Sequence, residues 1–488
     1  MKNSVGKIRI FFLAAEAVPF VKVGGLGDVA GALPQAIKRI RELNSKSVEM
    51  DIRVALPYHP MIDQKYKTAP PLISFWVHSR LKRYEVHVYC IENDGVPLYL
   101  FDAEPIRKCQ SVYSLNTLED GEKFILFSKA SLQFLKSIKW RPDILHVNDW
   151  HTAIASYLNR NCVFQTKIPF SILTLHNLPF MGAGTEPALT QFNIPPIDDE
   201  DLPVWARTLP LPIGLASVDK IVAVSPNYAK EIQTRKVGCG LDTFFINRKE
   251  SITGILNGID TEIWDPNSDP YISRNFDKGH IPLRAENKRK VQSDFGFVQS
   301  EEIPLLILIS RMDFQKGVDI VLDGLNSISD LPWQAVILGS GDPNLEASSI
   351  KLGKAFPKKV KSVLRFDSKL SHELFAGADI LLMPSRYEPC GLTQMIAMRY
   401  GCIPVARKTG GLADTIITKT LRNKTGYHFS KISVVSFTVT LKKALNDYSN
   451  LSKWRSIQKN AMSVDFSWEK SALEYSLLYE NIIFCKKV

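Results

Sequence analysis

Short apolar runs alternate along the chain with stretches in which apolar residues recur every three to four positions. Apolar runs bounded by polar residues predict buried strands, and the three-to-four spacing predicts amphipathic helices. In the first half, helical spacing is found at 27–42 and 122–137. The strands predicted there are 8–15, 51–56, 75–78, 84–91, 97–101, 144–147, 170–175 and 220–224.

The same alternation starts again near residue 304. The strands predicted in the second half are 304–309, 334–338, 362–366, 380–383 and 403–406, and helices are predicted at 317–325 and 467–483. Asn, Asp, Pro and Gly cluster between 257 and 303, which predicts the joint between two domains. Strands that alternate with helices favour a parallel sheet covered on both faces, so the chain is predicted to hold two α/β domains.

Composition and charge narrow the class of protein. A chain of 488 residues is too long for one compact core, which agrees with two domains. The formal net charge of +11 suits an anionic ligand or nucleic acid. No basic run carries interleaved aromatic residues, so nucleic-acid binding is not expected.

Two further features of the sequence concern the cellular compartment of the protein. The seven cysteines are odd in number and none has CxxC spacing, so neither disulfides nor a zinc site is expected, which fits a reducing cytoplasm. The apolar stretch 8–21 is interrupted by Arg9, Glu16 and Pro19, and it is interpreted as a buried strand and its loop rather than a signal peptide. No run approaches the ~20 apolar residues of a membrane helix.

A glycine-rich segment, Lys22 to Asp28, follows the first predicted strand and opens a helix. Backbone amides at Gly24 and Gly25 and the helix N-terminus would favour a phosphate, and Lys22 adds a full charge. A dinucleotide fingerprint is the alternative interpretation. It is weakened because the second strand ends in Leu-Pro-Tyr-His, residues 56–59, with no acidic residue to bind a ribose.

Two motifs in the second half also follow predicted strands. Arg311 and Lys316 lie after the strand 304–309 and near the start of a helix, where two cations can bind an anion. Glu388 follows the strand 380–383 and precedes Cys390, Gly391, Leu392 and Thr393. A carboxylate there can accept hydrogen bonds from sugar hydroxyls, and the next residues resemble a helix N-terminus. Solvated surface residues are the alternative for each.

The motifs together resemble those of bacterial glycogen synthases and plant starch synthases. Residues 22–28 are similar to that family's KxGGLxD signature, and further family blocks follow in the family's order over about residues 8–483. These blocks are 146–151 (HVNDWH), 174–177 (TLHN), 254–260 (GILNGID), 264–266 (WDP), 310–317, 388–394, 410–415 (GGLADT) and 466–468 (FSW).

The resemblance implies a GT-B fold, in which two Rossmann-like domains face a central cleft. The implied N-terminal, acceptor-side domain is 1–257, the nucleotide-sugar-binding domain is 258–464, and a last helix within 465–488 returns to the first domain. The implied activity is retaining transfer of glucose from ADP-glucose to the non-reducing end of an α-1,4-glucan. No metal or other cofactor is implied, because Arg and Lys would neutralise the leaving group.

The resemblance also implies roles for individual residues. The catalytic set is Lys22, Asp149, His176, Arg311, Lys316 and Glu388. The donor-binding set is Gly24, Gly25, Asp28, Asn177, Asn257, Phe366, Cys390, Gly391, Leu392 and Thr393. For His176 a buried structural histidine, and for Asp149 a helix cap, are the alternatives that the residues alone leave open.

Departures from the family pattern gather in the N-terminal half. Gly121 and Lys123 replace an Asn and an Arg, Met181 replaces a Gln, and 211–214 replaces a Lys-Gly-Gly segment. We therefore expect acceptor use, rather than donor use, to differ from that of the family. Ile396 stands where other retaining transferases have a second Glu, as it does in the glycogen synthase branch.

Four alternatives remain from the sequence. They are a UDP-glucose-dependent glucan synthase, another GT-B enzyme of the sucrose or trehalose type, a Rossmann dehydrogenase, and a weakly active glucan-binding or priming protein. The oligomeric state is not predicted.

Overall fold

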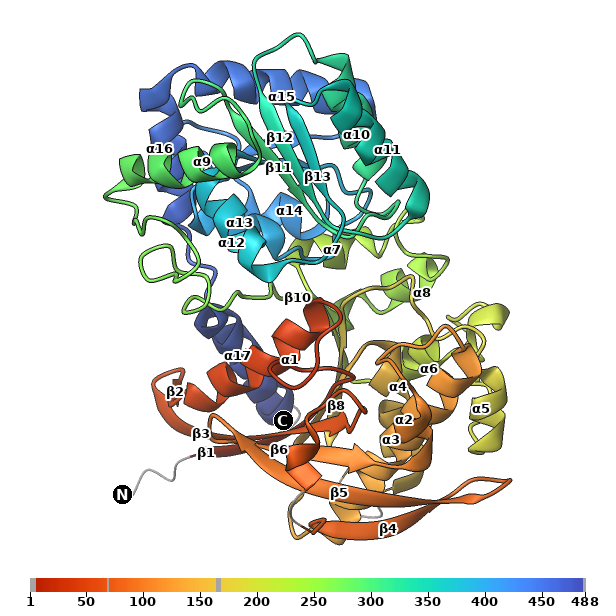
Figure 1. Ribbon diagram of the computed structural model, residues 1–488. Coiled ribbons are helices and arrows are strands. Elements are labelled where there is room, and N and C mark those ends of the chain that lie inside the picture. The colour runs from red at the N-terminus through yellow and green to blue at the C-terminus, as the bar shows by residue number, and fades with distance from the viewer. Residues whose placement is uncertain (1–5, 68–69, 164–167, 486–488) are drawn as a thin grey trace. The chain divides into compact units, whose positions relative to one another are not determined.

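A computed structural model describes residues 6–67, 70–163 and 168–485 (Figure 1). The chain divides into two compact units. Unit 1 runs as far as Gly258 and resumes at Trp468, and unit 2 comprises Ile259–Ser467. Within the described ranges, no helix is long and apolar enough to cross a membrane.

Unit 1 is built on a sheet whose strand order is β10-β9-β8-β7-β1-β3-β6-β5-β4, with β2 paired to β3. Seven of these strands are parallel neighbours. They are β1 (Gly6–Leu13), β3 (Lys46–Pro57), β6 (Val96–Asp102), β7 (Ile144–Asn148), β8 (Phe170–Leu175), β9 (Lys220–Ala223) and β10 (Ile252–Gly254). Helices cover both faces, which is why the central strands are almost continuously apolar.

One edge of this sheet differs from the predicted parallel arrangement. The strands β4 (Ile73–His78) and β5 (Arg83–Asn93) pair antiparallel, and β5 also pairs antiparallel with β6. Away from this edge, β2 (Glu42–Leu43) pairs antiparallel with β3. The prediction was wrong at this edge because the links are too short for the crossover that parallel strands require. Strand positions alone do not reveal this, since both arrangements show the same apolar pattern.

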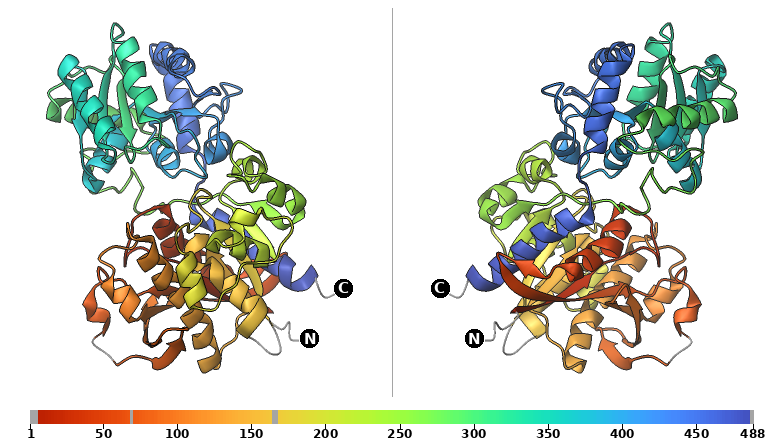
Figure 2. Two further views of the ribbon diagram at one scale, coloured as in Figure 1. Left: turned by 90° about the vertical axis from the view of Figure 1, so that its right-hand side faces the viewer. Right: turned by 90° about the vertical axis from the view of Figure 1, so that its left-hand side faces the viewer.

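Helices of unit 1 hold the strands from both sides. α1 (Gly25–Arg39) packs against α17 (Trp468–Cys485), and both views of Figure 2 show the dark blue α17 beside the red first segments of the chain. α3 (Thr117–Ser137) packs on α4 (Asp149–Leu158), which also packs on α6 (Pro210–Ser217). The helix predicted at 467–483 is therefore present, and it belongs to the core of unit 1.

Unit 2 contains a sheet in the order β13-β12-β11-β14-β15-β16, with every neighbouring pair parallel. Its strands are β11 (Leu305–Ile309), β12 (Gln334–Leu338), β13 (Val360–Val363), β14 (Ile380–Met383), β15 (Ile403–Arg407) and β16 (Tyr427–Phe429). Its longer helices are α9 (Arg284–Asp294), α10 (Val318–Ser327), α11 (Pro343–Ala355), α12 (Ser368–Gly377), α15 (Val434–Tyr448) and α16 (Leu451–Met462).

The strand predicted at 362–366 begins and ends earlier than expected. β13 ends at Val363, so Phe366 lies in the following loop with its side chain 85% exposed. The apolar Phe extended the predicted run, but the pairing of β13 with β12 stops at Leu338 and Val363.

Candidate active site

The carboxyl ends of β1, β7 and β8 are neighbours in the sheet of unit 1, so the loops that follow them meet at one edge. These loops carry the glycine-rich turn, Asp149 and His176. In unit 2, β11 and β14 are likewise neighbours, and they are followed by Arg311 and Glu388. Each unit therefore brings one group of predicted site residues together at the carboxyl edge of its sheet.

A buried carboxylate organises the turn after β1. Glu16 is only 1% exposed, and its carboxylate accepts hydrogen bonds from the backbone N–H groups of Val23 and Gly24, the latter at 3.0 Å. Its Oε1 also accepts a hydrogen bond from the Tyr113 hydroxyl at 2.9 Å. The Gly24 amide thus has a protein partner in place of the phosphate that we expected, and the phosphate roles of Gly24 and Gly25 stay predictions.

Lys22 and Asp28 form an ion pair beside this turn, with Nζ and Oδ1 2.7 Å apart. Gly24 precedes α1 and Gly25 is its first residue. The helix N-terminus that the sequence predicted is present, and Lys22 is half-exposed beside it. Glu16 was missed as an organising residue because its partners are backbone amides and a tyrosine 97 residues away, for which the sequence carries no signal.

Asp149 is a buried residue with an unusual backbone. Its φ of 51° is in the left-handed region, which strains a non-glycine residue. Its Oδ1 accepts hydrogen bonds from the backbone N–H groups of His176 at 2.7 Å and Asn177 at 3.3 Å. Asp149 is the first residue of α4, but its carboxylate binds the loop after β8, so its role is to join two loops rather than to cap its own helix.

Burial has a large effect on this carboxylate. Burial raises the pKa of Asp149 to about 7, and the negative charge of Glu16 adds to the rise, although the two backbone N–H donors oppose it. Perturbed carboxyl groups of this kind gather at functional sites.

The imidazole of His176 is neutral and held in one orientation. Burial lowers the pKa of His176 to about 3. Its Nε2 is 2.9 Å from Oδ1 of Asn148, whose Nδ2 donates to the backbone carbonyl of Leu13 at 2.8 Å. Because the Asn148 oxygen can only accept, Nε2 carries the proton and Nδ1 presents a lone pair. Asn148 therefore orients His176, a role that sequence reasoning missed.

Two predicted donor-site residues have unsatisfied oxygens. The Oδ1 atoms of Asn177 and Asn257 are buried and have no hydrogen-bond donor among the described residues. Most buried polar atoms in native proteins are paired, so such oxygens are typical of sites that a ligand or water completes. This supports the placement of both residues in a binding site.

In unit 2, Lys316 and Glu388 form a nearly buried ion pair. Lys316 Nζ is 2.7 Å and 2.9 Å from the two carboxylate oxygens of Glu388, and the Ser385 hydroxyl donates to Oε2 at 3.0 Å. Arg311 is exposed, and its Nη2 lies 3.2 Å from Oδ2 of Asp313. Both cations are therefore engaged by carboxylates before any anionic ligand is bound.

The turn after Glu388 leads into α13 (Thr393–Arg399). Gly391 has a φ of 74°, and the Gln394 side chain donates hydrogen bonds to the carbonyls of Cys390 and Gly391 at 3.1 Å and 2.8 Å. Leu392 directly precedes the helix. Residues 390–393 thus form a fixed turn at a helix start, as predicted, whereas Phe366 is exposed and its contact with a nucleotide base stays a prediction.

The N-terminal departures lie inside the unit rather than on a binding surface. Lys123 is fully buried, and its Nζ donates to Asp120 Oδ1 and to the Val112 carbonyl, both at 2.7 Å. A Cβ on Gly121 would lie 2.8 Å from Cβ of Thr185, Met181 is 8% exposed, and Leu211 and Gly214 are buried in α6. The side chains of Lys123 and Met181 are therefore buried in the packing of unit 1, and the expected difference in acceptor use stays a prediction.

Comparison with known proteins finds a family model for each half of the chain. Residues 9–247 match the family model of the starch synthase catalytic domain, and residues 292–461 match that of the glycosyl transferases group 1. Glycogen synthases of Streptococcus gordonii and Lactobacillus acidophilus are each 36% identical to the chain, covering 98% of it and 100% of their own length.

Solved structures give the same result for the fold. The catalytic domain of starch synthase IV from Arabidopsis thaliana, bound to ADP and acarbose, has a TM-score of 0.87 and 28% identity, covering 98% of this chain and 99% of that one. A sucrose-phosphate synthase from Thermosynechococcus elongatus has a TM-score of 0.61 at 16% identity, with 98% and 100% covered, and shares the fold.

Two α/β units with largely parallel sheets, together with the two family models, define the chain as a glycosyltransferase with the GT-B fold. The match to glycogen synthases over their full length is more specific. The chain belongs to the glycogen synthase family.

Proposed function

We propose that this enzyme transfers glucose from ADP-glucose to the non-reducing end of an α-1,4-glucan, with retention of configuration. The observation that carries the proposal is the match to glycogen synthases over 98% of the chain. It is supported by the starch synthase that was solved with ADP and acarbose. The seven cysteines are odd in number and lack CxxC spacing, which agrees with a cytoplasmic setting, and we propose that setting for the reaction.

In the proposed reaction, the bond between glucose C1 and the diphosphate oxygen breaks while the acceptor hydroxyl bonds to C1. Lys316 and Arg311 of unit 2 stabilise the negative charge of the leaving ADP. Lys22 of unit 1 adds a further positive charge that stabilises it. The acceptor proton goes to the departing phosphate oxygen. The Lys316–Glu388 ion pair must rearrange when the donor binds, so that Lys316 contacts phosphate and Glu388 accepts hydrogen bonds from glucose hydroxyls.

Residues of unit 1 position the reacting sugar in this proposal. Asp149 fixes the backbone of His176 and Asn177 through two N–H donors, and Asn148 fixes the ring of His176. Retention proceeds without a covalent enzyme intermediate, because the place of a second glutamate is taken by Ile396, which is 9% exposed. A glycosyl-enzyme adduct trapped and seen by mass spectrometry would contradict this.

Turnover with ADP-glucose and with UDP-glucose, each with glycogen and with short maltodextrins, tests the proposal. We expect transfer to both acceptors and a higher specificity constant for ADP-glucose. A higher specificity constant for UDP-glucose would identify UDP-glucose as the donor. If neither donor supports transfer, the protein is a glucan-binding protein rather than an enzyme.

A further inference from the structure

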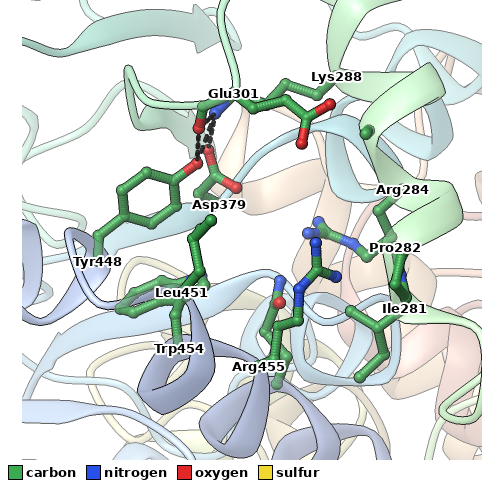
Figure 3. A pocket seen from close by; sticks show the side chains of 12 residues that line it. Ile281, Pro282, Arg284, Lys288, Glu301, Asp379, Tyr448, Leu451, Trp454 and Arg455 are labelled. Carbon is green, nitrogen blue, oxygen red and sulfur yellow. Dashed lines mark hydrogen bonds and ion pairs between the residues drawn. The ribbon is translucent and has the colours of Figure 1, made fainter.

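A cationic cavity lies in unit 2 at the opposite edge of the sheet from Glu388. Asp379 directly precedes β14 and Glu301 lies shortly before β11, so the cavity is at the amino ends of the strands. Its other walls are formed by α9, which provides Arg284 and Lys288, and by α16, which provides Arg455 (Figure 3). Its volume is about 40 Å³.

Two of the three cations in the cavity lack a carboxylate partner. Lys288 pairs with Asp379, Nζ and Oδ2 being 2.8 Å apart, and Glu301 Oε1 is 3.0 Å from Nη1 of Arg289. Arg284 is only 5% exposed and donates through Nη2 to the carbonyls of Phe375 and Ala378. Neither Arg284 nor Arg455 has an ion pair with any residue that the structure describes.

The two guanidinium groups also repel one another. Figure 3 shows them next to each other in the cavity. Burial lowers the pKa of Arg284, and the charge of Arg455 adds to this, while Asp379 acts in the opposite direction. Arginine stays charged in proteins, so an anion between the two guanidinium groups would relieve this repulsion.

The size and donors of the cavity indicate which anion fits. One water needs roughly 10–15 Å³ of such space, so the cavity is several times larger than a single water requires. Guanidinium N–H groups match the oxygens of phosphate-like anions in pairs. The cavity has room for an anion of the size of phosphate or sulfate.

We propose that the cavity binds a small inorganic oxyanion, phosphate or sulfate, between Arg284 and Arg455. The anion joins α9 to α16 and so stabilises unit 2. The site is separate from the carboxyl-edge residues, and the proposal stands whether or not the proposed function is correct.

Thermal unfolding of the full chain at increasing inorganic phosphate tests this, with pH and ionic strength held constant by potassium chloride. We expect a saturable rise in Tm, roughly 3–5 °C at tenfold excess over the dissociation constant. Sulfate should act similarly. The half-buried Arg455 is the residue to replace, since Arg455→Gln removes one guanidinium without opening the core.

The control is Lys459→Gln, which removes an exposed charge from the same helix, α16, outside the cavity. In Arg455→Gln we expect to lose the part of the Tm rise that comes from phosphate bound in the cavity. In Lys459→Gln we expect the same Tm rise as in the wild type. Any stabilisation by phosphate at the donor residues persists in both variants. Equal phosphate responses in the wild type and Arg455→Gln would overturn the proposal. A response to glucose 6-phosphate that is as large and as dependent on Arg455 would overturn its restriction to inorganic anions.

Discussion

Asp149 shows how one residue can link strain, burial and function. Its carboxylate is buried and its pKa lies near 7, well above that of an unfolded chain. The folded protein therefore binds a proton that the unfolded chain releases between about pH 4 and 7. Its contribution to stability is fully present below pH 4 and is lost as pH rises through about 7.

We expect Asp149→Asn to reduce this pH dependence, because an amide oxygen can still accept the two backbone hydrogen bonds. The measurement is urea unfolding at several pH values between 5.5 and 8.5. The free energy of unfolding of the variant, relative to that of the wild type, should increase as pH rises. A difference that is constant across this range would show that Asp149 does not titrate there.

Asn148 allows a test of the neutral His176 ring. In Asn148→Asp a carboxylate faces Nε2, which raises the pKa of His176 and favours its protonated form. We expect the acid limb of the kcat/KM profile for glucose transfer to move to higher pH. In Asn148→Ala we expect a lower kcat without that shift. If both variants keep the wild-type profile, Asn148 has only a packing role.

Lys316 and Glu388 are expected to be essential to turnover. Each substitution to Ala removes contacts to the leaving phosphate or to the sugar, which cost roughly 3 kcal/mol in such sites, or about two orders of magnitude in turnover. The matched control is the Lys369–Glu373 pair on α12, in which Lys369 is exposed and Glu373 half-buried, and which should tolerate the same changes. Near-normal transfer by folded Lys316→Ala and Glu388→Ala would refute the site assignment.

At the scale of elements, α3 carries two of the departures from the family pattern, Gly121 and Lys123. Lys123 is buried, and its ammonium group donates to Asp120 and to the Val112 carbonyl. Gly121 lets α3 approach α5 (Glu186–Gln191) closely. Gly121 and Lys123 therefore affect how α3 packs.

We therefore expect Lys123→Arg combined with Met181→Gln to lower stability by about 1–3 kcal/mol through overpacking and burial of an amide. The Michaelis constant for glycogen should not change. Lys136→Arg, on the exposed face of the same helix, is the control. If the Michaelis constant for glycogen changes while the stability does not, these residues contact the acceptor directly.

Apolar patterning predicted most strands of the fold, since buried strands such as β7 and β14 are short apolar runs between polar residues. It did not distinguish the antiparallel β4 and β5 from parallel strands, and it missed β2, β10 and β16, which are too short to show a period. Among the longer helices, only α1, α3, α10 and α17 were predicted, and α4, α9, α11, α12, α15 and α16 were not. In the site, residues with charge or glycine were identified from the motifs. Glu16 and Asn148 were missed because their roles arise from hydrogen bonds to groups distant along the chain.

At the scale of the whole molecule, α17 completes the core of unit 1 although it is separated from the rest by all of unit 2. The Tyr479 hydroxyl and His146 Nδ1 are 2.7 Å apart, and both residues are buried. Burial lowers the pKa of His146 to about 3, so the ring stays neutral and needs this partner.

We expect Tyr479→Phe to destabilise unit 1 by about 1–3 kcal/mol, because it leaves a buried nitrogen without a hydrogen bond. Hydrogen exchange followed by mass spectrometry should show faster exchange in β7 and β8 and no change in β11 to β15. Tyr271→Phe, at an exposed position of unit 2, serves as the comparison. Faster exchange in both units would mean that they unfold together.

The return of the chain to unit 1 at Trp468 also determines the order in which the protein is completed during synthesis. A ribosome adds about 5–20 residues per second, so the stretch 259–485 takes roughly 10–45 s. Throughout that interval the nascent unit 1 lacks α17, and the face of α1 that α17 covers stays open. Unit 2 therefore has all of its residues first, and the half of the enzyme that emerges earliest is the last to be completed.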